Sequence, residues 1–288
     1  MTAGSGDLLR LALPNKGRLA DPAVDLLRAA GVDLELGERR LSAVARNLPL
    51  ELLFVRADDV PEYVDDGLVD IGLTGEDLVA ERGRALEPIE RLGFGACSLV
   101  IAVPVGGPIR DVTDLAGRRI ATSFPRVTAR FLDDRGVSAQ VVEVGGAVEV
   151  TPQLGVADAI VDLVASGTTL RLNGLRAIAT LLESEAVLVR RADTDGDGPV
   201  RALVAMLRSV LDARGREYMM MNAPESALPR IRELIPGLSG PTVMPLAEQG
   251  MIAVHSVVER RSLWRIVPEL KAVGARDILV VPIEKVIR

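Results

Sequence analysis

Two carboxylates and a cluster of small hydroxyl residues lie close together near the middle of the chain. Asp158 and Asp162 fall in an apolar stretch, Ala157–Val164, that we predict to be a buried strand. The turn after it is Ala165, Ser166, Gly167, Thr168 and Thr169, whose short side chains let a phosphate approach the backbone N–H groups. Asp162 precedes this turn closely enough to bind the hydroxyls of a phosphorylated ribose. The pattern therefore predicts a phosphoribosyl site, although an ordinary strand and turn have the same pattern.

A short basic loop follows the first predicted strand, Leu8–Leu13. Lys16 and Arg18 flank Gly17, which keeps the backbone between them accessible. Arginine offers a bidentate fork to phosphate oxygens and lysine a point charge, so we interpret the loop as a phosphate site. A solvated basic turn is the alternative, but it is less expected directly after a buried strand. Two further arginines are candidates on charge and position alone: Arg39 and Arg56.

We place Asp70 and Thr74 at the end of the third predicted strand, Val69–Leu73. We expect both side chains to face a second lobe, where Asp70 would contact ribose or polar groups of a nucleotide. Alternatively, Asp70 only caps the turn that follows. The stretch Gly67–Gly75 also resembles Gly155–Gly167, because each runs from a glycine through an acid-bearing strand to a hydroxyl-glycine turn. Open α/β sheets bind ligands at such strand ends.

Composition limits the classes of protein to which this chain can belong. Its 288 residues correspond to roughly two domains with room for a third small one, and 48% of them are hydrophobic. No apolar run approaches the ~20 residues of a membrane span, and Met1–Asp7 lacks the pattern of an export signal. The single cysteine, Cys97, excludes an intrachain disulfide and suits a reducing compartment. We therefore expect a cytoplasmic protein with no membrane partner.

Net charge and histidine content exclude further classes. The net charge is −6 and no dense basic run is present, which argues against a nucleic-acid partner. The chain has one histidine, His255, so a histidine-based triad and a multi-histidine zinc site are both impossible. We expect His255 to point to solvent from a strand.

Apolar runs and helical segments alternate along the first two-thirds of the chain, which indicates a mostly parallel α/β architecture. Pro104 and the glycines after it follow the predicted strand Ser98–Val103 and mark the start of a second α/β lobe. The predicted strand Ala186–Arg190 could return to the first lobe, which would leave a ligand-binding cleft between the two lobes. We predict lobe I over residues 1–98 and 181–210, lobe II over 99–180, and a third domain over 211–288.

The third predicted domain contains strands and helices in the order βαββαβ. This order predicts a ferredoxin-like module, and such modules often regulate rather than catalyse. Its predicted elements are Glu217–Asn222, Glu225–Leu234, Thr242–Leu246, Met251–Val258, Ser262–Val273 and Asp277–Val281.

Seven motifs occur in a specific order along nearly the whole chain. They are Leu13–Leu19, Val69–Asp77, Leu92–Ser98, Ile120–Pro125, Gly146–Glu149, Leu154–Leu163 and Ser166–Thr169. In this order and spacing they resemble those of the long form of ATP phosphoribosyltransferase. The resemblance implies a two-lobed, periplasmic-binding-protein-like catalytic unit with a regulatory C-terminal domain. It also implies the reaction of ATP with phosphoribosyl pyrophosphate to phosphoribosyl-ATP and pyrophosphate, with Mg²⁺ and with feedback inhibition by L-histidine.

The resemblance assigns roles around the hydroxyl turn. The turn 165–169 would bind the 5′-phosphate, Asp162 would bind the ribose hydroxyls directly or through Mg²⁺, and Glu149 would orient ribose or a metal-bound water. Asp158 would share this role or cap the strand entry. Magnesium is expected to be held mainly by pyrophosphate oxygens and water, with Glu149 and Asp162 as its protein candidates. Ala147 replaces a serine common in this motif, which removes one possible hydroxyl contact.

The same resemblance implies a site for ATP and pyrophosphate and a site for the effector. The first site would consist of Leu13, Lys16, Gly17, Arg18, Arg39, Arg56, Asp70 and Thr74. The second would lie near Asn222, Thr242 and Asp277, unless these residues merely satisfy turns. A homo-oligomer is expected. The alternative interpretation is a non-catalytic, two-lobed small-molecule sensor.

Overall fold

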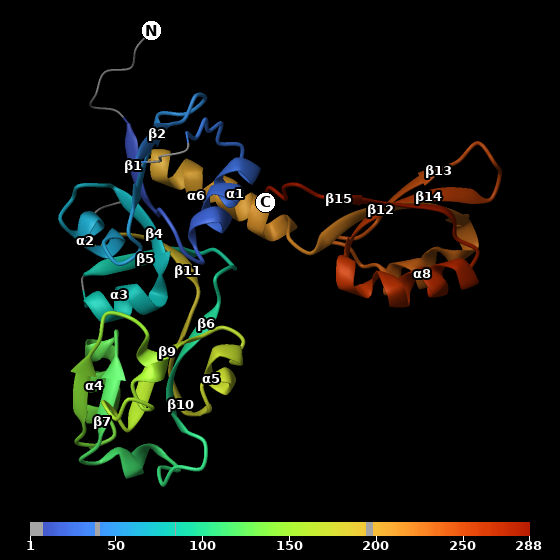
Figure 1. Cartoon of the computed structure of the whole chain (residues 1–288). Helices are drawn as coiled ribbons and strands as arrows, with labels where there is room; N and C mark the ends of the chain where they lie inside the picture. The colour runs from blue at the N-terminus through green and yellow to red at the C-terminus, as the bar shows by residue number, and fades with distance from the viewer. Residues whose placement is uncertain (1–7, 38–40, 84, 194–197) are drawn as a thin grey trace. The chain divides into compact units, whose positions relative to one another are not determined.

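The computed structural model describes residues 8–37, 41–83, 85–193 and 198–288 (Figure 1). It divides into two compact units, Met1–Val204 and Ala205–Arg288. The boundary falls within helix α6, Gly198–Ala213. The first unit contains two sheets and the second unit contains one. Arg39, one of the predicted phosphate ligands, and the N-terminal stretch Met1–Asp7 lie outside the described residues.

The first sheet has the strand order β2-β3-β1-β4-β11-β5. Its central strands β3, β1 and β4 run parallel, while β11 is antiparallel to both β4 and β5. Helix α2 packs on one face through Val60 and Val64, which meet Ala12, Val187 and Val189. The elements around this sheet are β1 (Leu9–Pro14), α1 (Ala20–Ala29), β2 (Ser42–Val44), β3 (Leu50–Val55), α2 (Val60–Asp65), β4 (Ile71–Gly75), α3 (Glu76–Arg82), β5 (Leu86–Arg91) and β11 (Ala186–Arg191).

The second sheet has the order β10-β6-β9-β7-β8. Alternate residues of β6 point to opposite faces, so that Leu99 and Ile101 meet helix α4 while Val100 and Ala102 meet helix α5. The two helices therefore cover opposite faces of the sheet (Figure 1). Its elements are β6 (Cys97–Pro104), η1 (Val112–Leu115), β7 (Arg119–Thr122), α4 (Pro125–Asp133), β8 (Gln140–Glu143), η2 (Val148–Val150), β9 (Ala159–Val164), α5 (Thr168–Leu172) and β10 (Leu175–Ser184).

The chain passes between these two sheets twice. The first passage joins β5 to β6 through residues 92–96, and the second joins β10 to β11 at Glu185. Because β11 returns to the first sheet, that sheet is built from two separated parts of the chain. The two-lobed α/β class predicted from the sequence is confirmed.

The second unit is a four-stranded antiparallel sheet with the order β13-β14-β12-β15. Both of its helices lie on one face, where Ile231 of α7 and Leu270 of α8 join Met219 and Val254 in a single core. This is the predicted ferredoxin-like βαββαβ module, which is confirmed. Its elements are β12 (Arg216–Pro224), η3 (Glu225–Ala227), α7 (Leu228–Leu234), β13 (Thr242–Pro245), β14 (Met251–Glu259), η4 (Arg260–Ser262), α8 (Leu263–Ala272) and β15 (Arg276–Pro282).

Candidate active site

The basic loop lies at the carboxyl ends of the parallel strands of the first sheet. Strands β1 and β3 are parallel and in register from Leu9 to Pro14, and the Asn15 N–H donates to the Val55 carbonyl at 2.7 Å. Lys16 and Arg56 therefore follow neighbouring strand ends, and both side chains are exposed. Within the described ranges, neither side chain makes a hydrogen bond or an ion pair. Two cations at one sheet edge are thus available to an anionic ligand.

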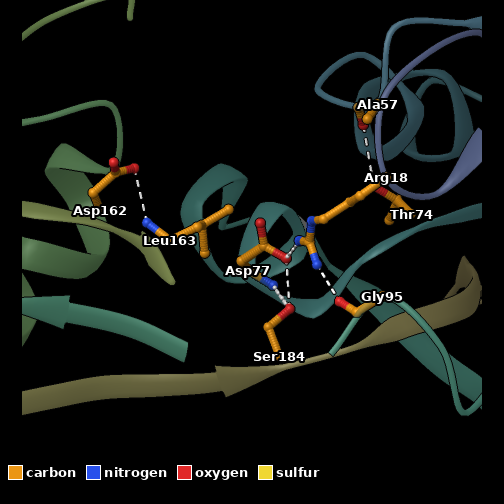
Figure 2. A network of polar contacts seen from close by, with 8 residues as sticks. All are labelled: Arg18, Ala57, Thr74, Asp77, Gly95, Asp162, Leu163 and Ser184. Atoms are coloured by element: carbon orange, nitrogen blue, oxygen red, sulfur yellow. Dashed lines mark hydrogen bonds and ion pairs between the residues drawn. The ribbon is translucent and has the colours of Figure 1, made fainter. Parts of the chain in front are cut away.

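Arg18 is engaged within the protein instead (Figure 2). Its guanidinium donates to Asp77 Oδ1 at 2.9 Å and also to the Gly95 carbonyl. Asp77 is 1% exposed, and the Ser184 hydroxyl donates to the same carboxylate oxygen at 2.5 Å. Sequence analysis predicted Arg18 as a phosphate ligand but did not identify Asp77 or Ser184. Asp77 lies 59 residues after Arg18 in the chain, and Ser184 lies 107 residues after Asp77. No local sequence pattern can therefore indicate these contacts.

Leu13 and Thr74 lie in the core and not on a ligand surface. The Leu13 side chain is fully buried in β1, and Thr74 is fully buried in β4 with its hydroxyl donating to the Ala57 carbonyl at 3.1 Å (Figure 2). The interpretation of these two side chains as ligand contacts is not favoured, because each is already surrounded by protein. Gly17, by contrast, is exposed, with a φ of +87° that favours glycine.

Asp70 lies at the amino ends of the strands, whereas the basic loop lies at their carboxyl ends. The expectation that Asp70 lies at the end of its strand was therefore wrong. It precedes β4, and its Oδ2 accepts the Arg10 N–H at 2.7 Å. Asp158 does the same in the second sheet, where it precedes β9 and its Oδ2 accepts the Arg119 N–H at 2.9 Å. Both carboxylates therefore hold the amino ends of adjacent parallel strands together. For Asp158 this is the strand-capping alternative that the sequence left open.

The hydroxyl turn leaves the carboxyl end of β9 and leads into α5. Ser166, Thr168 and Thr169 are exposed, and the Ser166 and Thr168 hydroxyls are 3.1 Å apart. Arg171 also reaches the Thr168 hydroxyl, at 3.2 Å. The first N–H groups of a helix have no acceptor within it, so those of α5 are directed into the turn. The turn thus gathers backbone donors, hydroxyls and one guanidinium at the surface.

Asp162 and Glu149 lie beside this turn. Asp162 is in β9, against which η2 with Glu149 packs, and its Oδ1 accepts the Leu163 N–H at 2.8 Å (Figure 2). Burial raises the pKa of Asp162; the hydrogen bond from Leu163 lowers it, and the negative charge of Glu149 raises it further. A carboxylate held in such surroundings gains from a hydrogen-bond donor or cation supplied by a ligand.

The donor set around Asp162 limits how a divalent metal could bind. Throughout the described part of the chain, no three His, Cys, Asp or Glu side chains come together as a metal site. Asp162 and Glu149 therefore fit a metal whose other ligands come from a bound substrate and water, as Mg²⁺ prefers. They do not fit a permanent metal centre built by protein side chains alone.

A cavity of about 400 Å³ lies between helices α3 and α4. Glu81 of α3 accepts the N–H groups of Arg126 and Val127 at 2.9 Å each, and Arg126 donates to the Arg82 carbonyl at 2.7 Å. Neither Glu81 nor Arg126 was predicted, because their partners lie more than 40 residues away. The cavity is lined in part by Asp58, Glu81, Arg82, Ser123, Arg126 and Glu143.

In the second unit, two of the three predicted effector residues meet. The Asn222 amide donates to Asp277 Oδ2 at 3.0 Å, whereas Thr242 lies on β13 opposite His255 of β14. His255 is half-buried, and its Nδ1 is 3.3 Å from the Tyr218 hydroxyl. His255 therefore lies in a strand as predicted, with its side chain partly exposed and next to Tyr218.

None of the helices in the described ranges is long and apolar enough to cross a membrane.

The fold and its strand-end groups define a class of protein. It is a two-lobed α/β unit with an exposed hydroxyl turn, two carboxylates beside it and an exposed basic loop, followed by a ferredoxin-like module. The profile of the ATP phosphoribosyltransferase family matches residues 56–209, and that of its C-terminal domain matches residues 213–285. The chain belongs to the ATP phosphoribosyltransferase family.

Similar proteins agree along the full length. The chain is 44% identical to an ATP phosphoribosyltransferase of Methanocella arvoryzae over 285 residues, covering 98% of this chain and 100% of the relative. It is 45% identical to that of Methanothermobacter thermautotrophicus, covering 97% and 99%. A solved ATP phosphoribosyl transferase (HisG:HisZ) complex from Thermotoga maritima matches with a TM-score of 0.62 and 29% identity, covering 70% of this chain and 96% of that one.

The family defines the reaction. The chain is a glycosyltransferase that joins the phosphoribosyl group of phosphoribosyl pyrophosphate to ATP, the first step of histidine biosynthesis. The resemblance inferred from the seven sequence motifs is therefore confirmed.

Proposed function

We propose that this chain catalyses the transfer by aligning its two substrates, and that the end of β9 is the phosphoribosyl site. The observation that supports this most is Asp162, a carboxylate with a raised pKa near the carboxyl end of β9, three residues before Ala165 of the exposed hydroxyl turn. The turn 165–169 would bind the 5′-phosphate through N–H groups and hydroxyls. Asp162 and Glu149 would accept hydrogen bonds from the ribose hydroxyls.

The chemistry needs no protein nucleophile. In the proposed reaction N1 of adenine attacks the anomeric carbon of ribose, a C–N bond forms, and the C–O bond to pyrophosphate breaks. Alignment of two bound reactants lowers such a barrier by on the order of 7–11 kcal/mol. The carboxylates beside the ribose would stabilise the positive charge that develops on the sugar.

Lys16 and Arg56 are the cations that we assign to the polyphosphates. Both are exposed at the carboxyl edge of the first sheet, where parallel α/β sheets bind ligands. Lysine supplies a mobile point charge and arginine a fixed fork. Their assigned ligands are the phosphates of ATP and the pyrophosphate that leaves.

Magnesium, when bound, would neutralise charge on the pyrophosphate leaving group. Asp162 and Glu149 are the residues that would hold it, directly or through water. Because the described residues offer this pair and no third ligand, the metal would arrive with its substrate.

The second unit is the proposed site of feedback inhibition by L-histidine. Asp277 is an anion for the ammonium group, and the Asn222 amide and Thr242 hydroxyl are hydrogen-bonding groups near the same sheet. Inhibition requires two states that histidine binds unequally. We also propose that the enzyme works in the cytoplasm as a homo-oligomer.

The test is an assay of the purified chain with ATP, Mg²⁺, phosphoribosyl pyrophosphate and pyrophosphatase, which pulls the reaction forward. Phosphoribosyl-ATP is followed by its ultraviolet absorbance, with and without histidine. Formation of the product supports the catalytic proposal, and its suppression by histidine supports the regulatory one. No product, together with calorimetric binding of histidine alone, would favour the alternative of a non-catalytic sensor.

Two matched variants sharpen the assay. Lys16→Gln and Lys271→Gln remove the same charge, but Lys271 belongs to α8 of the second unit. We expect Lys16→Gln to lower kcat/KM for ATP by about tenfold, the value of a hydrogen bond to a charged group. Equal kinetics of the two variants would contradict the role of Lys16.

A further inference from the structure

Asp77 is a buried acid to which the proposed mechanism gives no task. It is 1% exposed, and within the described residues its second oxygen, Oδ2, is buried with no hydrogen-bond partner. A charge in such a place is costly unless it is paired, and Asp77 is paired with Arg18. We propose that Asp77, assisted by Ser184, is a positioning residue that holds Arg18 and thereby fixes the loop carrying Lys16.

The contacts of Arg18 and Asp77 connect four segments of the chain. Arg18 itself belongs to the loop between β1 and α1, and Asp77 opens helix α3 after β4. Gly95 lies in the first passage between the two sheets, and Ser184 is the last residue of β10, before the second passage (Figure 2). One ion pair therefore ties the substrate-binding loop to both places where the chain passes between the sheets.

Two glycines leave the room that this arrangement requires. A Cβ added at Gly75 would collide with Asp77 Oδ1 and would lie 3.3 Å from Arg18 Nη2. A Cβ at Gly95, whose φ is +66°, would collide with the Leu19 side chain. Both positions fall in the motifs that identified the family, although neither glycine is near the hydroxyl turn in sequence. Gly75 therefore leaves room for the Arg18–Asp77 pair itself, and Gly95 leaves room for Leu19, the residue next to Arg18.

The link to the reaction runs through Lys16. Only Gly17 separates Lys16 from Arg18, and the exposed Lys16 side chain makes no hydrogen bond or ion pair within the described residues. The position of the Lys16 ammonium thus depends on the backbone that Arg18 anchors. A displacement of a catalytic group by about 1 Å costs about 100-fold in rate. This inference rests on the proposed role of Lys16 in phosphate binding.

Cys97 provides a report on the same contacts that does not depend on catalysis. The thiol is buried, and its strand partner in the β6–β10 ladder is Ser184. Burial raises the pKa of Cys97, while the nearby positive charge of Arg18 lowers it. Because this is the only cysteine in the chain, its alkylation measures how often this region opens.

The experiment compares Asp77→Asn with Glu87→Gln in the full-length chain. Glu87 also pairs with an arginine of the first sheet, Arg190, at 2.8 Å, but it is 48% exposed and far from the loop in sequence. For Asp77→Asn we expect kcat to fall about 10- to 100-fold with ATP. Binding of phosphoribosyl pyrophosphate, measured by calorimetry, should stay within about twofold, because the hydroxyl turn is unchanged. Alkylation of Cys97 should accelerate, and Glu87→Gln should match the wild type in all three measurements.

Other outcomes overturn the proposal. An unchanged kcat in Asp77→Asn, or an equal loss of phosphoribosyl pyrophosphate binding, would show that Asp77 does not act through the loop. If Asp77→Asn does not fold, Ser184→Ala replaces it, since it removes one donor and keeps the ion pair. Ser184→Ala should then lower kcat in part and accelerate alkylation, and wild-type values of both would refute the proposal. Absence of product from the wild type would instead contradict the proposed function, while unchanged alkylation in the variants would contradict the positioning role.

Discussion

At the residue scale, the Asp162 carboxylate that we assign to substrate binding also lowers the stability of the folded protein at neutral pH. Its pKa is raised in the folded protein above the ordinary value of 3.8, chiefly by burial. The folded state therefore holds the proton more tightly than the unfolded chain, so this group's contribution to stability is present below the unfolded pKa. That contribution is lost as pH rises through the folded pKa. At neutral pH Asp162 therefore lowers the stability of the fold, as is common for groups that function in binding.

Asp162→Asn should accordingly raise the stability of the folded protein and lower its catalytic activity. We expect the free energy of unfolding in urea to exceed that of the wild type at about pH 7, with the difference vanishing near about pH 4. The value of kcat/KM should fall about 10- to 100-fold, because a hydrogen bond to a charged group is lost. Asp158→Asn is the matched control, since its carboxylate holds the Arg119 N–H and its loss should destabilise. A destabilised Asp162→Asn at neutral pH would contradict the argument.

At the element scale, helix α3, which follows a strand of the first sheet, caps the start of helix α4, which follows a strand of the second sheet. The Glu81 carboxylate of α3 accepts the first two N–H groups of α4 at 2.9 Å each, where the helix dipole favours negative charge. Glu81→Ala should lower the free energy of unfolding by about 1 kcal/mol, and Glu81→Gln by about half of that. Urea denaturation measures both. Glu143 lines the same cavity but does not cap α4, so the free energy of unfolding of Glu143→Gln should stay within about 0.5 kcal/mol of the wild-type value. Equal effects at Glu81 and Glu143 would refute the cap.

The elements also show which parts of the fold the sequence could predict. Buried strands such as β1 and β9 have apolar runs, and the hydroxyl turn is contiguous, so both were predicted correctly in place. Strand β10 was missed because bulges at Ala177/Ala179 and Thr180/Leu182 break its alternation. Strands β2 and β5 were also not predicted. Strand β2 has only three residues and none of them is buried, while β5 contains Pro88, which argues against a strand in a sequence pattern. Asp70 was misplaced because β4 begins after it, and the Arg18–Asp77 pair depends on topology that no local pattern contains.

At the scale of the whole molecule, an acidic protein must bind two polyanions. The net charge is −6, while the basic loop contains one of only three lysines in the chain, so general electrostatic attraction does not favour ATP or phosphoribosyl pyrophosphate. Neutralisation must be local, and part of it must come with the substrate. The proposed magnesium site supplies this, because the described side chains offer Asp162 and Glu149 but no third ligand beside them.

This charge balance predicts an order of binding. Titration of MgCl₂ into the free protein should give no saturable heat below about 1 mM, because Mg²⁺ dehydrates reluctantly for one or two carboxylates. With phosphoribosyl pyrophosphate present, the metal should bind at one saturable site, and the two ligands should each strengthen the other by the same factor. Asp162→Asn should reduce that coupling, whereas Asp158→Asn should retain it, since Asp158 holds the Arg119 N–H at the other end of the strand. Tight Mg²⁺ binding to the free protein would mean that protein side chains build the site before the substrate arrives, and would contradict substrate-borne neutralisation.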